Sequence, residues 1–246
     1  ERVGALLDGP ARSWPRQHRA QINVWLAEHW EHSDPRAAGK AARAAMADAG
    51  LDGLLMFRQE SMYYLTGYDT FGYVFFQCLY LGADGRMTLL TRAPDLRQAQ
   101  HTSIIDDIRV WVDRDGATPA DDLRAILEEH GCKGQRLGVE YEAYGLTARN
   151  GKRLDAALDG FALLEDASEL VTRLRVVKSE AEVAYVRRAA ELADDALDAA
   201  QDVIAPGAFE GDVLAAMHGA IYRGGGDDPG NEFIIGSGPQ VMKEKS

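Results

Sequence analysis

The 246-residue chain contains little cysteine, no long apolar run and no excess of positive charge. Its two cysteines, Cys78 and Cys132, have neither metal-binding nor redox spacing, which predicts a reducing compartment rather than a disulfide-rich secreted domain. No apolar stretch approaches the ~20 residues that cross a bilayer. The first residues, Glu1 to Gly4, also lack the charged-then-apolar pattern of a secretory signal. We therefore expect a cytoplasmic protein without a membrane segment.

The charge balance argues against nucleic acid as a partner. The formal net charge is −12 at pH 7, and no basic stripe is interleaved with aromatic residues. Such a chain repels phosphate backbones. The apolar content of 46% is ordinary for a globular core, so the composition also argues against a disordered chain.

A long helix is predicted after Lys178. Ser179 and Glu182 have the spacing of a capping box, which satisfies two backbone N–H groups of the first turn. Pro206-Gly207 should end the helix after about 27 residues, or about 40 Å. Three alanines in its apolar stripe favour packing on a sheet, although the same spacing is also compatible with a coiled coil. The stripe consists of Val183, Val186, Ala190, Ala193, Leu197, Ala200 and Ile204.

The segment before residue 170 alternates between helix and strand patterns. This alternation predicts an α/β fold, with a mainly parallel or mixed sheet covered by helices. Asp84-Gly85 should form the turn of a hairpin. Helices are predicted at 14–30, 35–46, 118–131 and 146–157, and strands at 54–57, 74–81, 87–90, 108–112, 137–139, 161–164 and 232–235.

Several histidines could bind a metal but have simpler interpretations. His29 and His32, with Glu28 and Glu31, share a helical spacing, yet a metal site usually needs a third ligand. A solvated helix face explains these four residues better. The remaining candidates, His101, His130 and His218, are isolated in the sequence.

Two glycine-rich segments resemble catalytic or phosphate-binding motifs only in part. Gly224-Gly225-Gly226 follows a predicted helix and precedes a strand, whereas a phosphate loop leads into a helix, so a turn is the better interpretation. Ser237 lies between Gly236 and Gly238, but a nucleophile elbow has the spacing G-x-S-x-G. We therefore assign no catalytic residue.

The segment Arg58 to Gln77 is the best candidate for ligand binding. It joins two predicted strands, and loops at strand ends are where open α/β sheets bind ligands. Aromatic rings and a carboxylate are concentrated in its middle. These residues could equally belong to the hydrophobic core or line a ligand pocket. Of the two, we predict the pocket role, with substrate binding by Tyr68, Asp69, Phe71 and Tyr73.

Sequence motifs then resemble one known superfamily. Met62 to Tyr68 looks like the N-terminal-domain signature of the creatinase, prolidase and aminopeptidase P superfamily, the "pita-bread" metallohydrolases. Leu174 to Glu182 is similar to its interdomain segment, and Phe233 to Gly238 looks closest to the ectoine hydrolase-like branch. The order of these motifs strengthens the resemblance. Further matching positions are Pro206-Gly207, Glu210 and Gly224-Gly225.

The resemblance implies a domain plan. Residues 1–34 would be a helical extension, 35–170 a creatinase-like N-terminal domain, and 171–246 the beginning of an α+β pita-bread domain. Members of the superfamily bind two divalent metal ions through aspartates, a histidine and glutamates that lie beyond the last strand predicted here. We therefore expect no metal site and no activity in this chain alone; Asp194, Asp195 and Asp212 are not substitutes for the missing ligands.

The implied activity is metal-dependent hydrolysis of a C–N bond in a small substrate, such as an Xaa-Pro peptide or an ectoine-like osmolyte, by a homodimer. Two alternatives remain open. The chain could be a non-catalytic dimerisation module, or part of a related lyase that acts on a sulfonium osmolyte.

Overall fold

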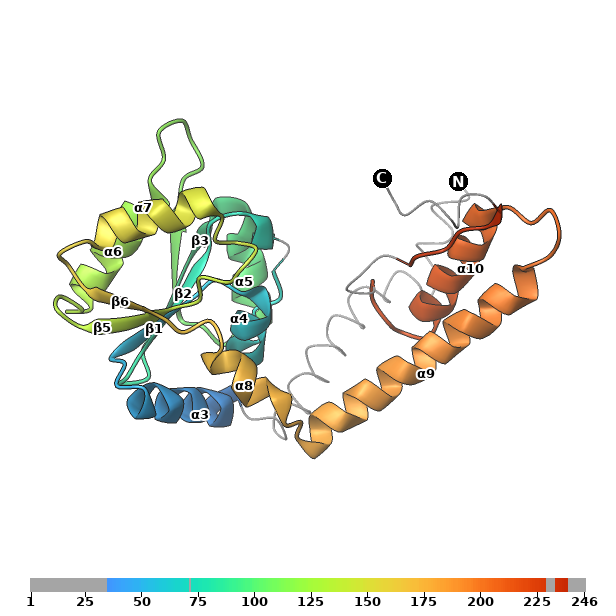
Figure 1. Ribbon diagram of the computed structural model, residues 1–246, viewed down its shortest axis with the longest axis horizontal. Coiled ribbons are helices and arrows are strands. Elements are labelled where there is room, and N and C mark those ends of the chain that lie inside the picture. Colours follow the sequence, from blue (N-terminus) through green and yellow to red (C-terminus); the bar gives the residue numbers. More distant parts are fainter. Residues whose placement is uncertain (1–34, 71, 229–232, 239–246) are drawn as a thin grey trace. The chain divides into compact units, whose positions relative to one another are not determined.

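The computed structural model describes residues 35–70, 72–228 and 233–238. The chain forms two compact units, which meet in the sequence between Val177 and Lys178 (Figure 1). No helix in the described part of the chain is both long and apolar enough to cross a membrane. The predicted helix at 14–30 and the metal-ligand candidates His29 and His32 lie outside the described residues.

The first unit is built on a six-stranded mixed sheet with the order β4-β3-β2-β1-β5-β6. The hairpin strands are antiparallel, so that β2 pairs with β1 and β3, while the β3–β4, β1–β5 and β5–β6 pairs are parallel. The expected α/β class is therefore confirmed. The strands are β1 (Gly53–Met56), β2 (Cys78–Gly82), β3 (Met87–Arg92), β4 (Asp107–Trp111), β5 (Arg136–Val139) and β6 (Leu163–Asp166).

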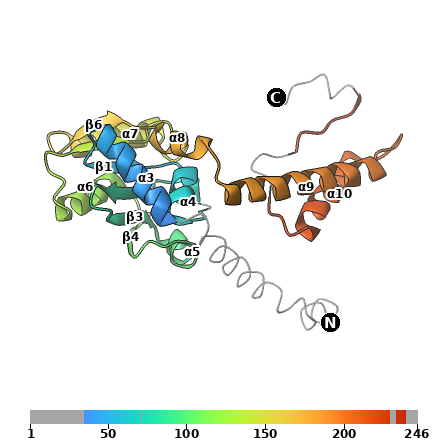
Figure 2. The same cartoon turned by 90° about the horizontal axis from the view of Figure 1, so that it is seen from below.

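Helices cover both faces of this sheet (Figures 1 and 2). Because side chains alternate along a strand, Leu55 of β1 packs in the core under α6 and α7, while Leu54 and Met56 pack in the core under α3, α4, α5 and α8. The helices are α3 (Pro35–Asp48), α4 (Gln59–Thr66), α5 (Leu96–Thr102), α6 (Pro119–Glu129), α7 (Ala148–Leu158) and α8 (Leu170–Val176), with 3-10 turns η1 (Gly72–Val74) and η2 (Ala93–Asp95).

Two predicted strands begin later than expected. The strand predicted at 74–81 starts at Cys78, because Gly72–Val74 forms a 3-10 turn and Gln77 uses its buried side chain for hydrogen bonds. The strand predicted at 161–164 corresponds to β6, which begins at Leu163. It begins later because the backbone N–H of Phe161 donates a hydrogen bond to the carbonyl of Leu158 at the end of α7. The hairpin is confirmed, and Gly85 at its turn has a φ of 91°.

Helix α8 belongs to the first unit, although it follows the boundary predicted at residue 170. Val171 is buried in the same core as Met46 of α3 and Met62 of α4. The first unit therefore continues to Val177.

The second unit contains α9 (Glu180–Val203) and α10 (Glu210–Arg223). The capping box of Ser179 and Glu182 is confirmed. Helices α9 and α10 pack on each other, and Ala196, Ala200, Val213 and Ile221 are their buried side chains.

The predicted apolar stripe of α9 is largely exposed in this chain. Of its seven residues only Ala200 is buried, while Val186, Leu197 and Ile204 are exposed. Helix α9 has two apolar faces. The spacing of apolar residues along the sequence identified only the longer face. Part of the strand predicted at 232–235, residue 232, lies outside the described residues. The prediction was wrong for residues 233–235, which pair with no other strand within the described ranges.

Candidate functional site

The loop between α4 and β2, residues 67–77, contains the predicted substrate-binding residues. Gly67 adopts a left-handed conformation with a φ of 75°, and its N–H donates a 2.7 Å hydrogen bond to the carbonyl of Tyr63. This cap ends α4 and turns the chain, which a residue with a side chain would do at higher energy.

Tyr68 points into the protein and anchors the loop. Its side chain is fully buried, and its hydroxyl donates a 2.7 Å hydrogen bond to Oε1 of Gln77. Thr70 and Thr91 donate to the same oxygen over 3.3 and 3.2 Å. Burial raises the pKa of Tyr68, so the phenol stays protonated and remains a donor. Tyr68 can therefore influence a ligand only through the position of the loop.

The tip of the loop is exposed. Asp69 faces solvent, while its backbone N–H donates to Oγ1 of Thr102 in α5 over 3.1 Å. Tyr73 in η1 is 39% exposed, and the N–H of Gly72 donates to Oγ1 of Thr70 over 3.0 Å. The structure thus separates the predicted set into a buried anchor, Tyr68, and exposed residues, Asp69 and Tyr73. Phe71 lies outside the described residues.

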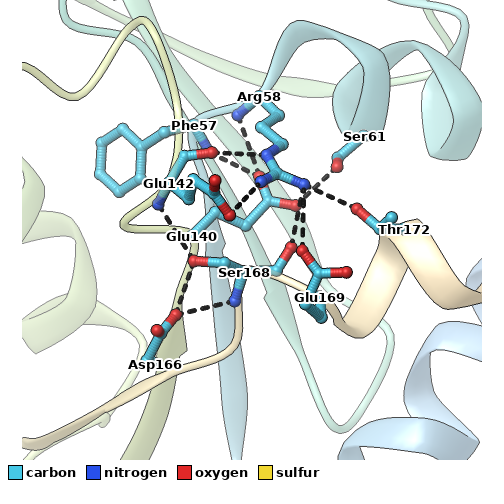
Figure 3. Close-up of polar contacts among 9 residues, drawn as sticks. All are labelled: Phe57, Arg58, Ser61, Glu140, Glu142, Asp166, Ser168, Glu169 and Thr172. Carbon is cyan, nitrogen blue, oxygen red and sulfur yellow. Dashed lines mark hydrogen bonds and ion pairs between the residues drawn. The ribbon is translucent and has the colours of Figure 1, made fainter.

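Sequence reasoning missed a second polar cluster, which is centred on Glu140 (Figure 3). The Glu140 side chain is fully buried after β5. Its Oε2 accepts hydrogen bonds from the backbone N–H groups of Phe57 and Arg58 over 3.0 and 2.9 Å, and its Oε1 accepts from the Ser61 hydroxyl over 2.5 Å. Burial raises the pKa of Glu140, and these hydrogen bonds oppose that rise.

Arg58 extends the cluster to the segment that follows β6. Its guanidinium donates to the carbonyls of Glu142 and Ser168 over 2.6 and 3.1 Å and to Oγ1 of Thr172 over 2.6 Å (Figure 3). These residues follow the carboxyl ends of parallel strands β1, β5 and β6, where open sheets commonly bind ligands. Here the side chains pair with one another, so the cluster joins three strands. The available sequence signal was a charged residue close after two buried strands, Arg58 after β1 and Glu140 after β5.

In the second unit, Ser237 contacts the start of α10. Its hydroxyl and its N–H both donate to Oε1 of Glu210, each over 2.7 Å. A serine held this way is positioned by a carboxylate rather than activated by a histidine. The turn interpretation of Gly224 to Gly226 is confirmed, because Gly224 caps α10 and Gly225 has a φ of 84°.

Comparison with known proteins decides the family. The Creatinase/Prolidase N-terminal domain matches residues 40–177, more than half of the chain. The chain belongs to this family.

Several relatives of this creatinase/prolidase chain are hydrolases by name. An uncharacterized hydrolase/peptidase of Sinorhizobium fredii is 29% identical over 203 residues, which is 80% of this chain and 52% of the relative. The ectoine hydrolase of Halomonas elongata is 27% identical, over 78% of this chain and 49% of the enzyme. The chain therefore spans about half the length of the curated relatives it matches.

Solved structures show the same fold. A prolidase from Thermococcus sibiricus superposes with a TM-score of 0.65 at 20% identity, covering 78% of this chain and 50% of the prolidase. An Xaa-Pro dipeptidase from Bacillus anthracis gives a TM-score of 0.61 at 21% identity, covering 77% and 49%.

The described residues of this creatinase/prolidase chain do not fit a metal ion. Nowhere in ranges 35–70, 72–228 and 233–238 do three histidine, cysteine, aspartate or glutamate side chains come together in a suitable group. His130 instead contacts Arg86 and Thr88, and the ring of His218 packs against Tyr222 and Phe233. No chemical step through a metal can be assigned to these residues.

Proposed function

We propose that this chain is part of a creatinase/prolidase-type hydrolase that cleaves a C–N bond in a small substrate, such as an Xaa-Pro peptide or an ectoine-like osmolyte. Family membership and relatives named as dipeptidase and ectoine hydrolase support this proposal. In the complete enzyme, residues 35–177 would contribute to substrate binding, while the bond-cleaving groups and two divalent metal ions would belong to residues outside those described.

One observation carries the role of the first unit: loop 67–77 combines a buried polar anchor with an exposed tip. Tyr68, Gln77, Thr70 and Thr91 share hydrogen bonds inside the protein. Such bonds hold the loop in one conformation, which lowers the entropy lost when a ligand is bound. Asp69 and Tyr73 then offer a carboxylate and an aromatic face, a combination that suits a cationic or zwitterionic group.

The loop would act across a subunit boundary. The family resemblance implies a homodimer in which the Tyr68 to Tyr73 loop enters the neighbouring subunit's active site. In that arrangement Asp69 and Tyr73 contact the substrate, and Tyr68 is a positioning residue.

The test is steady-state kinetics in the complete enzyme with Xaa-Pro dipeptides and ectoine-type substrates. We expect Phe71→Ala and Tyr73→Ala to lower kcat/KM about tenfold or more while changing Tm little, because pocket contacts act on the transition state rather than on folding. Tyr144→Ala is the matched control, since Tyr144 is 90% exposed and follows β5 outside the loop.

The Tyr68→Phe variant tests whether Tyr68 positions the substrate-binding loop or only stabilises the fold. It removes only the buried hydroxyl, so both Tm and kcat/KM should fall, whereas a purely structural tyrosine would change Tm alone. Full turnover in both Phe71→Ala and Tyr73→Ala, or loss of activity only through unfolding, would place the substrate pocket elsewhere.

A separate observation favours self-association as a second function. Val186, Leu197 and Ile204 of α9 are each more than half exposed in this chain. We propose that a second copy of the chain covers this face.

A further inference from the structure

A pocket of about 520 Å³ lies in the first unit, beyond the end of β4. Its walls come from the residues that precede β2, from the loop between β4 and α6, and from the first turns of α7. The β4–α6 loop projects beyond the sheet (Figure 1). The predicted substrate residues Tyr68, Asp69 and Tyr73 do not line it.

Three arginines line this pocket without a paired carboxylate. Arg114 comes from the β4–α6 loop, and Arg149 and Arg153 come from α7. All three are exposed, and their guanidinium groups form no ion pair or hydrogen bond with other described residues. Each therefore keeps its full set of donors for a ligand.

The acidic groups of the pocket only partly offset these charges. Asp113 is already paired with Arg92, whose Nη1 lies 3.6 Å from its carboxylate. Asp115 is the second acidic residue on the lining. On the lining itself the three arginines exceed the two aspartates, whereas the whole chain carries a net charge of −12. A local excess of positive charge on an acidic chain marks this pocket as a place for an anion.

The wall beside the arginines is aromatic and fixed. The indole N–H of Trp111 donates to the carbonyl of Phe76 over 2.9 Å. The guanidinium of Arg92 lies 3.3 Å from the centroid of the Phe75 ring, a cation–π contact that holds this ring in place.

We propose that this pocket binds a small dianion whose two anionic oxygen groups are paired by Arg114, Arg149 and Arg153. Guanidinium groups pair with carboxylate and phosphate through two parallel N–H···O bonds, so the ligand is a phosphate or phosphomonoester, or a short dicarboxylate. The side-chain amide of Asn150, also on the lining, can add a further donor. This site shares residues 74–76 with the loop 67–77 but none of the proposed substrate residues, and its test needs no enzyme activity.

Isothermal titration of the 246-residue chain at low salt, with inorganic phosphate and with succinate as probes, tests the proposal. We expect saturable one-to-one binding of at least one probe, weakened by added sodium chloride. Each of Arg114→Gln, Arg149→Gln and Arg153→Gln should weaken it about tenfold, as expected for loss of one charge-assisted hydrogen bond. The probe that binds more tightly identifies which anion the pocket prefers.

Arg97→Gln is the matched control. Arg97 is an exposed arginine of α5 outside the pocket, so the same charge change there should leave the affinity nearly unchanged. Arg149→Lys should retain the charge but lose paired hydrogen bonding, giving an intermediate affinity. Thermal unfolding of each variant checks that the fold is kept. Absence of saturable binding by both probes, or an equal loss in Arg97→Gln, would overturn the proposal.

Discussion

At the residue scale, the buried carboxylate of Glu140 is the clearest case of a side chain whose role depends on its partners. Phe57 and Arg58 donate their backbone N–H groups to it, and Ser61 donates its hydroxyl. These donors belong to the end of β1 and the start of α4, so one side chain joins two elements to β5. The sequence showed a glutamate after a buried strand, but not which groups would face it, because the pairing depends on the strand order.

Glu140→Ala should lower the free energy of unfolding by about 2–4 kcal/mol, because it leaves buried backbone donors without an acceptor. Glu140→Gln should cost much less, since an amide oxygen can accept the same two N–H groups. Urea denaturation of the three proteins measures the difference. Equal losses in the two variants would show that the charge, rather than the acceptor, matters.

The raised pKa of Glu140 also predicts the pH dependence of this comparison. Burial raises its folded pKa above the unfolded value of 4.5, so the stability it contributes is present at low pH and lost as the pH rises through the folded pKa. The glutamine variant has no such group to ionise. Its stability relative to the wild type should therefore improve from pH 4 to pH 8.

His130 provides the opposite pH dependence. Burial, followed by the positive charge of Arg86, lowers its pKa from 6.5. The neutral ring accepts from Arg86 at Nδ1 over 3.1 Å and donates from Nε2 to Thr88 over 2.8 Å, and Thr88 in turn donates to Asp107. A proton added at Nδ1 would face the Arg86 donor.

Because the folded pKa of His130 is depressed, its contribution to stability is present above the unfolded pKa and lost as the pH falls through the folded value. Tm should therefore fall as the pH is lowered from 7 to 5, and less steeply in His130→Gln. His101→Gln is the control, since His101 is an exposed residue at the end of α5. Identical Tm profiles for wild type and His130→Gln would contradict the assignment.

At the scale of elements, the local signals in the sequence predicted most of the first unit. The hairpin at Gly85, the end of α6 at Gly131 and the capping box of α9 all follow from short-range chemistry, and the structure has each of them. The strand predicted from residue 74 failed because the choice between strand and turn there depends on Gln77 finding buried partners. These partners, Tyr68 and Thr70, come from the same loop, and such side-chain pairing leaves no periodic pattern in the sequence.

The candidate site was less predictable than the fold. The loop itself could be located, because aromatic and acidic residues follow a buried strand. The inward direction of the Tyr68 side chain could not be predicted, since it depends on hydrogen bonds with Thr91 of β3 and with Gln77. The three-arginine pocket was missed because Arg114 and Arg149 come from different elements that only the fold brings together.

At the scale of the whole molecule, the two faces of α9 determine how the chain should behave in solution. Leu192, Ala196 and Ala200 lie toward α10 and its terminal glycines. The apolar stripe predicted from the sequence is exposed, with Val186 at 57%, Leu197 at 55% and Ile204 at 64%. A contiguous apolar surface of this kind usually marks an interface.

We therefore expect the 246-residue chain to self-associate through α9. Its mass in multi-angle light scattering should rise with protein concentration, and an apolar dye should bind the dilute protein, because the exposed stripe is covered only in the associated form. The double variant Val186→Ser, Leu197→Ser should shift association to higher concentration. Val177→Ser is the control, since Val177 is 82% exposed but lies outside the helix. A strictly monomeric protein at high micromolar concentration, with no dye binding, would show that this face needs no partner.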